Sequence, residues 1–280
     1  MTAPSRAAGG ADPGELLALA TAVAREAGAL VLDRGGVGGG ATAVGTKSSS
    51  TDVVTATDRA AEALIVQRLR AARPGDAVLG EEGGAQGSSA SGVRWLVDPL
   101  DGTVNYLYGI PQYAVSLAAE VDGEVVAGVV LDPAKDELYA ATLGGGATRN
   151  GRPIRCSDRA ELGQALVATG FSYDADRRAR QAAALARLLP AVRDIRRMGA
   201  AALDLCAVAC GRVDAYYEKA LHPWDVAAGA LIAREAGARV GTLQGAPDGS
   251  SFTGDFLLAT APGVHDALRR LLAELGADRD

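Results

Sequence analysis

The chain is poor in the side chains that build many common sites. Its 280 residues include three cysteines and two histidines, and aromatic residues make up 4%. Three cysteines without a C-x-x-C pair exclude a disulfide framework, and two histidines argue against a His-built zinc site and against most Ser-His or Cys-His hydrolases. Cys206 and Cys210 stand four apart in an apolar run, so we expect both to be inert core residues on one helix face.

Basic blocks and long apolar runs are also missing. Lys and Arg number 28 against 34 Asp and Glu, a net charge of −6, which disfavours nucleic acid as a partner. No apolar stretch approaches the roughly 18 residues that a membrane span needs, and the first residues lack the apolar segment of a signal peptide. We therefore expect a cytoplasmic protein with no membrane partner.

The length is that of one or two domains. Residues 1–13 are rich in Ala, Gly, Pro and Ser, and we expect them to form a disordered leader. Residues 14–280 are expected to form a single domain, with a break near residue 150 if it has two lobes. Glycine occupies 36 positions, about twice its usual share of ~7%, which indicates many tight turns.

Apolar periodicity predicts an α/β protein. Helical patterns run over 15–32, 57–72, 176–189, 200–210, 225–236 and 263–275. Strand-like runs cover 77–80, 95–97, 113–121, 124–131, 165–169, 193–196, 213–217 and 255–260. Asp122-Gly123 predicts a hairpin, which excludes a purely parallel sheet. We therefore expect mixed sheets layered between helices, with a turn-rich loop at 144–151.

Several acidic residues stand in apolar or glycine-rich surroundings. An apolar strand leads to Asp98, Pro99 is expected to end it, and Asp101 follows three residues later. Two carboxylates that lie so close together repel each other unless one is protonated or a cation lies between them. A group of oxygen ligands without histidine suits Mg²⁺. Free N–H groups at Gly102 and Thr103 can hold a phosphate. A plain turn with a strand-end cap explains the same residues.

Three further acidic segments have both a structural and a functional explanation. Glu81 and Glu82 follow a strand, so one can face a cleft while the other faces solvent, or both belong to an acidic loop. Asp225 precedes an apolar helix, where it can act as the N-cap, as a metal ligand, or as both. Thr55 and Asp58 match a capping box.

Together, and in this order, these segments are specific. Residues 52–58, 80–82, 95–106 and 224–229 resemble the inositol monophosphatase family, with the motifs D-P-x-D-G-T and W-D-x-A-A-G most specific. The resemblance covers roughly residues 15–275. It implies a layered αβαβα sandwich of the sugar-phosphatase type, usually dimeric, with a lithium-sensitive, Mg²⁺-dependent phosphomonoesterase activity.

The resemblance also implies individual roles. The expected metal ligands are Glu81, Asp98, the carbonyl of Leu100, Asp101 and Asp225. The expected catalytic residues are Glu81, Thr103 and Asp58, with Thr103 and Asp58 placing the attacking water. The expected substrate contacts are Lys47, Asp101, Gly102, Thr103, Ala201, Glu218 and Asp225. Ala200 stands where the family often has Ser or Thr, so a contact to substrate hydroxyls is missing.

The implied enzyme is a phosphoric monoester hydrolase. Its first candidate substrate is inositol 1-phosphate, hydrolysed by metal-activated water in a homodimer with roughly two or three Mg²⁺ per active site. Histidinol phosphate, fructose 1,6-bisphosphate and phosphoadenosine phosphate are alternatives on the same scaffold, since Glu218 suits a polyol and also a cationic substrate. A non-catalytic binding or regulatory protein is the alternative of another class. Degraded metal carboxylates would indicate it, and all four are present.

Overall fold

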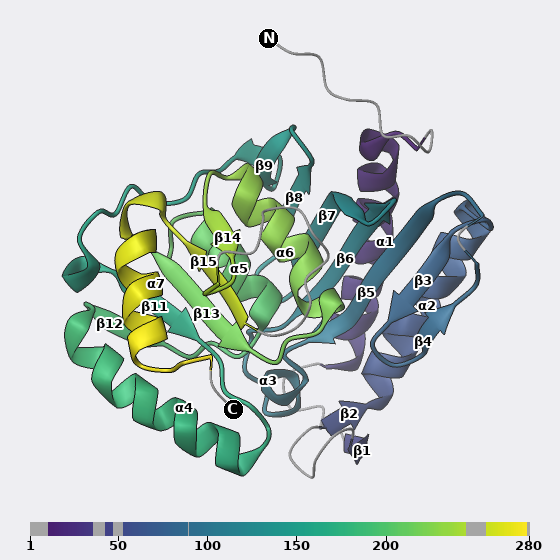
Figure 1. Cartoon of the computed structure of the whole chain (residues 1–280). Coiled ribbons are helices and arrows are strands. Elements are labelled where there is room, and N and C mark those ends of the chain that lie inside the picture. The colour runs from purple at the N-terminus through teal and green to yellow at the C-terminus, as the bar shows by residue number, and fades with distance from the viewer. Residues whose placement is uncertain (1–10, 36–42, 47–52, 89, 245–255, 279–280) are drawn as a thin grey trace.

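A computed structural model describes residues 11–35, 43–46, 53–88, 90–244 and 256–278. Two sheets form its centre (Figure 1). The larger sheet has the strand order β10-β9-β8-β7-β6-β5-β3-β4. Its strands are β3 (Ala77–Gly80), β4 (Gly84–Gln86), β5 (Val93–Asp101), β6 (Ala114–Val121), β7 (Glu124–Asp132), β8 (Glu137–Thr142), β9 (Gly146–Arg149) and β10 (Arg152–Pro153).

The smaller sheet has the order β12-β11-β13-β15-β14. Its strands are β11 (Leu166–Thr169), β12 (Asp194–Arg196), β13 (Ala215–Lys219), β14 (Arg239–Gly241) and β15 (Phe256–Thr260). β1 (Ala43–Thr46) and β2 (Val53–Thr55) pair separately as an antiparallel ribbon. Both larger sheets combine parallel and antiparallel neighbours, as the hairpin signals predicted.

Helices and sheets alternate in five layers (Figure 1). The helices are α1 (Pro13–Arg34), α2 (Ala56–Ala72), α3 (Thr103–Leu107), α4 (Ala175–Leu188), α5 (Ala201–Ala209), α6 (Pro223–Glu235) and α7 (His265–Glu274). Short 3₁₀ turns lie at Leu162–Gln164, Leu189–Ala191 and Pro262–Val264. α1 and α2 pack on one face of the larger sheet, α5 and α6 lie between the sheets, and α4 and α7 cover the smaller sheet. The expected αβαβα sandwich is confirmed.

Each pair of layers has its own apolar core. Trp95 and Leu117 lie between the larger sheet and α1 and α2, Leu205 and Leu231 lie between the sheets, and Leu268 of α7 packs against the smaller sheet. All five side chains are fully buried. At about 25 cal/mol per Å² of apolar area removed from water, these three interfaces supply the main favourable term that holds the layers in place.

The predicted hairpin at Asp122-Gly123 is confirmed, and it joins β6 to β7. Both residues have positive φ, 51° and 87°, as a type I′ turn requires. The predicted loop at 144–151 was wrong, because residues 146–149 form β9 and pair with β8. Gly144 and Gly146, with φ of 73° and 76°, make the turn that allows this pairing.

Two further predictions about element ends were wrong. β5 does not end at Asp98 but continues to Asp101, because a bulge shifts its pairing with β6 from Asp98↔Ser116 to Asp101↔Ala114. Pro99 lies inside the bulge, where a ladder N–H is not needed. α5 ends at Ala209, so Cys210 caps the helix and is half-buried, while Cys206 lies in the core.

The N-terminal residues of the described part already belong to a helix. Asp12 is the N-cap of α1, and its side chain accepts a hydrogen bond from the Gly14 N–H at 2.8 Å. The predicted leader, 1–13, therefore includes two residues of this helix start, Asp12 and Pro13. Residues 1–10 lie outside the described residues. Within the described residues, no helix combines the length and the apolar character that crossing a bilayer requires.

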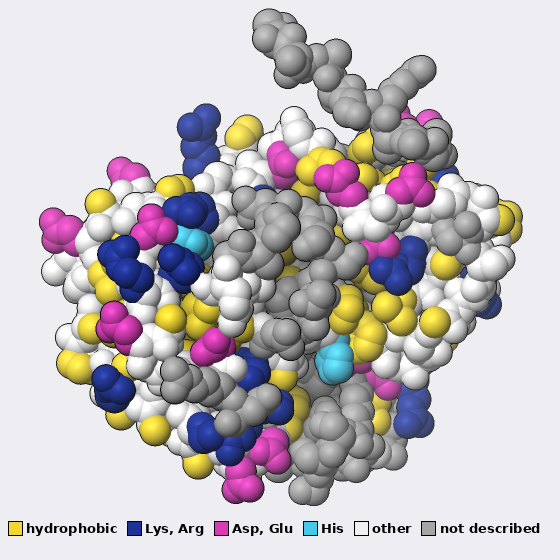
Figure 2. Space-filling view, in the orientation of Figure 1, with side chains coloured by type: hydrophobic (Ala, Val, Ile, Leu, Met, Phe, Trp, Pro, Cys, Tyr) yellow, Lys and Arg dark blue, Asp and Glu magenta, His cyan; other side chains and the backbone are white. Residues whose placement is uncertain are grey.

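Charged side chains are mixed over the surface of the fold. Figure 2 shows Lys and Arg side chains interspersed with Asp and Glu side chains and apolar atoms over the face drawn. This mixture agrees with a net charge of only −6.

Candidate active site

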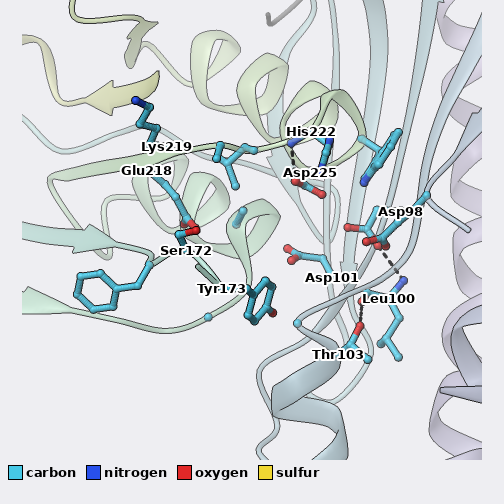
Figure 3. Close-up of a pocket in the computed structure, with 18 of the residues that line it drawn as sticks. Asp98, Leu100, Asp101, Thr103, Ser172, Tyr173, Glu218, Lys219, His222 and Asp225 are labelled. Atoms are coloured by element: carbon cyan, nitrogen blue, oxygen red, sulfur yellow. Dashed lines mark hydrogen bonds between the residues drawn. The ribbon is translucent and has the colours of Figure 1, made fainter. Parts of the chain in front are cut away.

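Segments far apart in the sequence meet around one cavity of about 520 Å³. Its lining comes from the turn after β3, the end of β5, the start of α5 and the connection from β13 to α6 (Figure 3). The structure brings nine of the predicted site residues to its wall: Glu81, Asp98, Leu100, Asp101, Gly102, Thr103, Ala201, Glu218 and Asp225. Lys47 lies outside the described residues.

Asp98 reaches the cavity from the bulge of β5. Its side chain is 2% exposed, and one carboxylate oxygen accepts a hydrogen bond from the Leu100 N–H at 3.0 Å. Burial raises the pKa of Asp98 well above its usual value, and the nearby charges of Glu81, Asp101 and Asp225 raise it further. The bulge thus directs a carboxyl group into a pocket that does not solvate its charge.

Asp101, three residues later, connects β5 to the start of α5. Its carboxylate accepts a hydrogen bond from the Ala202 N–H at 2.7 Å. Burial raises the pKa of Asp101 to about 7, the Ala202 hydrogen bond opposes this change, and the charges of Glu81 and Glu218 add to it. The cavity therefore disfavours the charged form of Asp101 as long as no cation is bound.

Asp225 enters from α6, but the prediction that it is the N-cap was wrong. Pro223 starts the helix with His222 as N-cap, so Asp225 is the third helical residue. Its carboxylate accepts a hydrogen bond from the His222 N–H at 2.7 Å, and the His222 ring stacks on Trp224 with centroids 4.8 Å apart. Burial, then the charges of Glu81 and Asp101, raises its pKa well above the usual value.

Figure 3 shows the carboxyl groups of Asp98, Asp101 and Asp225 directed toward a common space, with Glu218 across from them. Glu81 lines the same cavity while its neighbour Glu82 does not. The predicted extended segment was wrong, because β3 ends at Gly80 and both glutamates lie in the turn that follows, with Glu82 half-buried. Within the part of the chain that the structure describes, no three Asp, Glu, His or Cys side chains close around a single point. The acids therefore surround the cavity instead of forming one compact ligand cluster.

Asp58 does not line the cavity but contacts a residue of its wall. Thr55 and Asp58 form the predicted capping box at the start of α2, with the Thr55 N–H donating to the Asp58 carboxylate at 2.8 Å and the Thr55 hydroxyl donating to the same oxygen. The other oxygen accepts a hydrogen bond from the Thr103 hydroxyl at 2.8 Å. Asp58 is fully buried, so one carboxylate caps a helix and also contacts a residue of the cavity wall.

The segment after Asp101 begins with a glycine that no other residue can easily replace. Gly102 has φ 91° and ψ 34° and precedes the first turn of α3. A Cβ atom here would lie 2.9 Å from the Gln112 carbonyl oxygen. Because both the left-handed backbone and the space favour glycine, the chain can turn directly from β5 into α3 and leave Thr103 at the cavity.

Glu218 reaches the cavity from β13. Its carboxylate accepts a hydrogen bond from the Tyr216 hydroxyl at 2.6 Å. Burial raises the pKa of Glu218, while the Tyr216 hydroxyl and the positive charge of Arg197 lower it. A Cβ atom on Gly170 would lie 1.8 Å from a carboxylate oxygen of Glu218, so the glycine leaves the space that this side chain occupies.

The sequence analysis missed several residues of the wall. Tyr173, Arg177 and Arg197 line the cavity with Lys219 and Trp224. Trp224 lay within a quoted motif, but no local pattern indicated that Arg177, on α4, would face the same space. Ala201 lines the cavity at the start of α5, and Ala200 is buried just before it. The missing hydroxyl at residue 200 is thus a change close to the wall.

The acidic residues fit divalent cations. Carboxylate and carbonyl oxygens are the ligands that Mg²⁺ prefers. After burial, the negative charge of Glu81 raises the pKa values of Asp98, Asp101 and Asp225, because one negative charge disfavours another in a buried space. A cation among them would remove this repulsion, so the chemistry of the ligand atoms and their electrostatics agree.

Comparison with known proteins agrees with this geometry. The model of the inositol monophosphatase family matches residues 12–277. The chain is similar to the inositol-1-monophosphatase of Mycobacterium leprae, with 47% identity over 92% of this chain and 93% of that protein. It is also similar to the Nus factor SuhB of Xylella fastidiosa, with 46% identity over 71% of this chain and 72% of that protein.

The fold leads to the same family. The crystal structure of the extragenic suppressor protein suhB from Bartonella henselae superposes with a TM-score of 0.86 at 37% identity, over 92% of this chain and 98% of that one. The chain therefore belongs to the inositol monophosphatase family of phosphomonoesterases.

Proposed function

We propose that this protein hydrolyses a small phosphate monoester in a Mg²⁺-dependent reaction, with inositol 1-phosphate as the first substrate to test. One observation carries the proposal. Glu81, Asp98, Asp101 and Asp225 come from three separate segments of the chain and line a single cavity. An acidic cavity alone repels a phosphate dianion, so it serves an anionic ester only when cations reverse its local charge.

The family resemblance supplies the assignment of metal ligands, and all five residues line the cavity. Glu81, Asp98 and the Leu100 carbonyl would hold a first Mg²⁺, and Asp98, Asp101 and Asp225 a second. When bound, Mg²⁺ supplies neutralisation of the negative charge on the phosphate and a lowered pKa of a water molecule. In Figure 3 the Asp98 carboxyl group lies beside those of Asp101 and Asp225, which would suit a carboxylate that serves both ions.

The chain's own residues place the water and the phosphate. The Thr103 hydroxyl donates a hydrogen bond to Asp58 at 2.8 Å. The Thr103 oxygen can therefore accept a hydrogen bond from a water molecule in the cavity. Asp58, acting through the Thr103 hydroxyl, or Glu81 would take the proton of the attacking water as its oxygen bonds to phosphorus. The ester P–O bond breaks in the same step, and the leaving alkoxide takes a proton from water. The N–H groups of Gly102 and Thr103 hold the phosphate oxygens. Such a reaction depends on positioning and charge, with little covalent work for the protein.

Direct attack by water distinguishes this mechanism from one with a phosphorylated enzyme. The chain shows no nucleophile motif beside a base in the segments that form the cavity. Mass spectrometry of the enzyme quenched during turnover should therefore detect no added phosphate. A covalent phosphoenzyme trapped in this way would contradict the mechanism.

Glu218 is proposed to contact the substrate's hydroxyl groups from the wall opposite the metal ligands (Figure 3). A carboxylate accepts hydrogen bonds from a polyol. It also suits the cationic group of histidinol phosphate, and Arg177 and Arg197 suit an additional phosphate group. The residue at 200, alanine, offers no hydroxyl. The substrate is therefore best decided by experiment.

The test is phosphate release from a panel of substrates at varied Mg²⁺. The panel contains myo-inositol 1-phosphate, histidinol phosphate, fructose 1,6-bisphosphate and phosphoadenosine phosphate. We expect kcat/KM to depend on Mg²⁺ for each substrate that is used and to be highest for inositol 1-phosphate. Phosphate release that does not respond to Mg²⁺ would contradict the proposal.

A binding or regulatory role remains the alternative from another class. The relative from Xylella fastidiosa named Nus factor SuhB favours testing it, since that name is not the name of a phosphatase. The complete set of acids at the cavity favours catalysis instead. Mg²⁺-dependent turnover of any substrate in the panel decides for the enzyme.

The assembly and location are further parts of the proposal. The family resemblance implies a homodimer in the cytoplasm with Mg²⁺ and a small phosphate ester as its partners. Sedimentation velocity of the purified chain should give the mass of two copies of the 28.3 kDa chain. A monomer at micromolar concentration would contradict the dimer without affecting the proposed chemistry.

A further inference from the structure

Glu62 binds the loop that carries Glu81, although it does not itself line the active-site cavity. It lies on α2 and is 4% exposed. One oxygen of its carboxylate accepts a hydrogen bond from the Glu82 N–H at 2.8 Å, and the other accepts one from the Gly83 N–H at 2.7 Å. Both oxygens therefore hold consecutive backbone groups directly after Glu81.

The same carboxylate limits the space for a side chain at two glycines of this loop. A Cβ atom on Gly80 would lie 2.6 Å from the carboxyl carbon of Glu62, and one on Gly83 would lie 2.7 Å from a carboxylate oxygen. Any side chain at either position would push Glu62 away from the backbone that it holds. The sequence G-E-E-G thus has a glycine on each side of the acidic pair because Glu62 occupies that space.

The backbone of Glu81 is fixed from the other side by β5. The Glu81 N–H donates to the Val97 carbonyl oxygen at 3.1 Å, one residue beyond the pairing of Gly80 with Val97 in the parallel ladder. Val97 directly precedes Asp98. Glu81 therefore lies between two anchors, the strand that carries Asp98 and the carboxylate of Glu62.

We propose that Glu62 is a positioning residue for the metal site. By holding the N–H groups of Glu82 and Gly83 it determines the direction of the chain after Glu81, and so keeps the Glu81 side chain in the cavity beside Asp98. Hydrogen bonds to an ionised carboxylate are roughly twice as strong as neutral ones. The inference rests on the proposed function, since it assigns Glu81 to Mg²⁺.

The experiment compares Glu62→Ala and Glu62→Gln with the wild-type protein. Glu62→Ala removes both acceptors, whereas Glu62→Gln keeps one acceptor oxygen and should be intermediate. Glu26→Gln is the matched control, because Glu26 lies on α1 and its exposed carboxylate pairs with Arg68 of α2 at 2.7 Å. This control removes the same charge from a contact of α2 that does not involve the loop.

Two measurements are made on every variant. Hydrogen exchange of metal-free protein should show residues 80–86 exchanging at least about tenfold faster in Glu62→Ala, with the remaining segments unchanged. Calorimetric titration should show Mg²⁺ binding weakened by about ten- to a hundredfold, the usual cost of losing a residue that orients a ligand. The Mg²⁺ needed for half-maximal phosphate release should rise in parallel, with KM for the ester within about twofold.

The outcomes separate this inference from the proposed function. Wild-type exchange and wild-type Mg²⁺ binding in Glu62→Ala would overturn it, and so would faster exchange with unchanged Mg²⁺ binding, because the loop would then not determine where Glu81 lies. If Glu62→Ala does not fold, Glu62→Gln decides by the same two readouts. A wild-type protein that binds Mg²⁺ but releases no phosphate would contradict the proposed function alone, since exchange and calorimetry still test Glu62.

Discussion

The carboxylate of Asp101 accepts a hydrogen bond from the backbone N–H of Ala202 at 2.7 Å, across 101 positions of the sequence. Asp101 ends β5 in the larger sheet, and Ala202 lies in the first turn of α5 between the two sheets. A carboxylate at the start of a helix satisfies a free N–H group and is favoured by the helix dipole. One side chain thus joins two layers and faces the cavity.

Asp101→Asn should abolish most activity while the protein stays folded. The amide oxygen of Asn can still accept the Ala202 hydrogen bond, but the charge that would bind a cation is lost. Charge stabilisation by a metal is worth several kcal/mol, so we expect kcat to fall by about 10²-fold or more. Steady-state kinetics at saturating Mg²⁺ and circular dichroism measure the two effects.

Asp122→Asn is the control for this variant, because Asp122 is exposed in the β6–β7 hairpin. Its positive φ of 51° suits Asn as well as Asp. This control should retain wild-type kinetics. Wild-type turnover of Asp101→Asn would rule out a ligand role for Asp101.

Neighbouring glutamates in one loop should respond very differently to the same substitution. Glu81 lines the cavity and Glu82 does not, so Glu81→Gln should lose Mg²⁺ activation and Glu82→Gln should stay within about threefold of wild type. The comparison removes one charge in each case and changes almost no volume. Equal losses in the two variants would mean that the loop's total charge matters and not the direction of Glu81.

Gly170→Ala should weaken substrate binding without affecting the metal ligands. The added Cβ atom would lie 1.8 Å from a Glu218 carboxylate oxygen, so Glu218 must move. We expect KM for inositol 1-phosphate to rise by about tenfold and the free energy of unfolding to fall by about 1–3 kcal/mol, with Mg²⁺ half-saturation unchanged. Steady-state kinetics and urea titration provide these values.

Gly163→Ala is the matched control for that substitution. A Cβ atom there meets no heavy atom within 4 Å, and both kinetics and stability should stay close to wild type. An unchanged KM in Gly170→Ala would argue against a substrate contact by Glu218.

The metal-free protein should lose stability as the pH rises from about 4 to about 7. Burial raises the pKa of Asp101 from 3.8 to about 7, and burial also raises the pKa values of Asp98, Asp225 and Asp204. In this window the folded protein binds more protons than the unfolded chain, so the free energy of unfolding decreases with pH. Tm measured by calorimetry in a chelator should be lower at about pH 7.5 than at about pH 5.5.

Mg²⁺ should reverse this trend, because it replaces the protons that the acids release. The rise in Tm on adding Mg²⁺ should therefore be larger at the higher pH. Glu137 does not change the sign between about pH 5.5 and 7.5. Its hydrogen bond with Arg212 lowers its pKa from 4.5 to about 2, so its contribution to stability changes only between those two values. A metal-free Tm that rises from acidic to neutral pH would contradict the proposed cluster of repelling carboxylates.

Li⁺ at millimolar concentration should inhibit phosphate release. This expectation comes from the resemblance to a lithium-sensitive family. Na⁺ at the same ionic strength is the control, because it reproduces general screening of charges. Equal rates in the two salts at subsaturating Mg²⁺ would show that the metal sites differ from those of lithium-sensitive relatives.

The sequence predicted the mixed sheets and most helices because their apolar periodicity is local. The hairpin at Asp122-Gly123 needs only two residues with positive φ, and the capping box of Thr55 and Asp58 needs only one helix turn. The errors fell where a partner strand decides. Pro99 stays within β5 because β6 accommodates a bulge, and residues 146–149 became a strand because β8 lies beside them.

The order of the motifs was sufficient to predict which acidic residues belong to one site and to identify the family. D-P-x-D-G-T and W-D-x-A-A-G are local patterns, each a short turn around a carboxylate. The distances between motifs in space, and the contacts that no motif contains, were decided by the layering of the two sheets. Asp101 meets Ala202, and Glu62 meets the loop after Glu81, only because β3, β5, α2 and α5 pack around the same cavity. The sequence determines which acidic residues are present. Their raised pKa values depend on the tertiary structure, because only burial brings the like charges together.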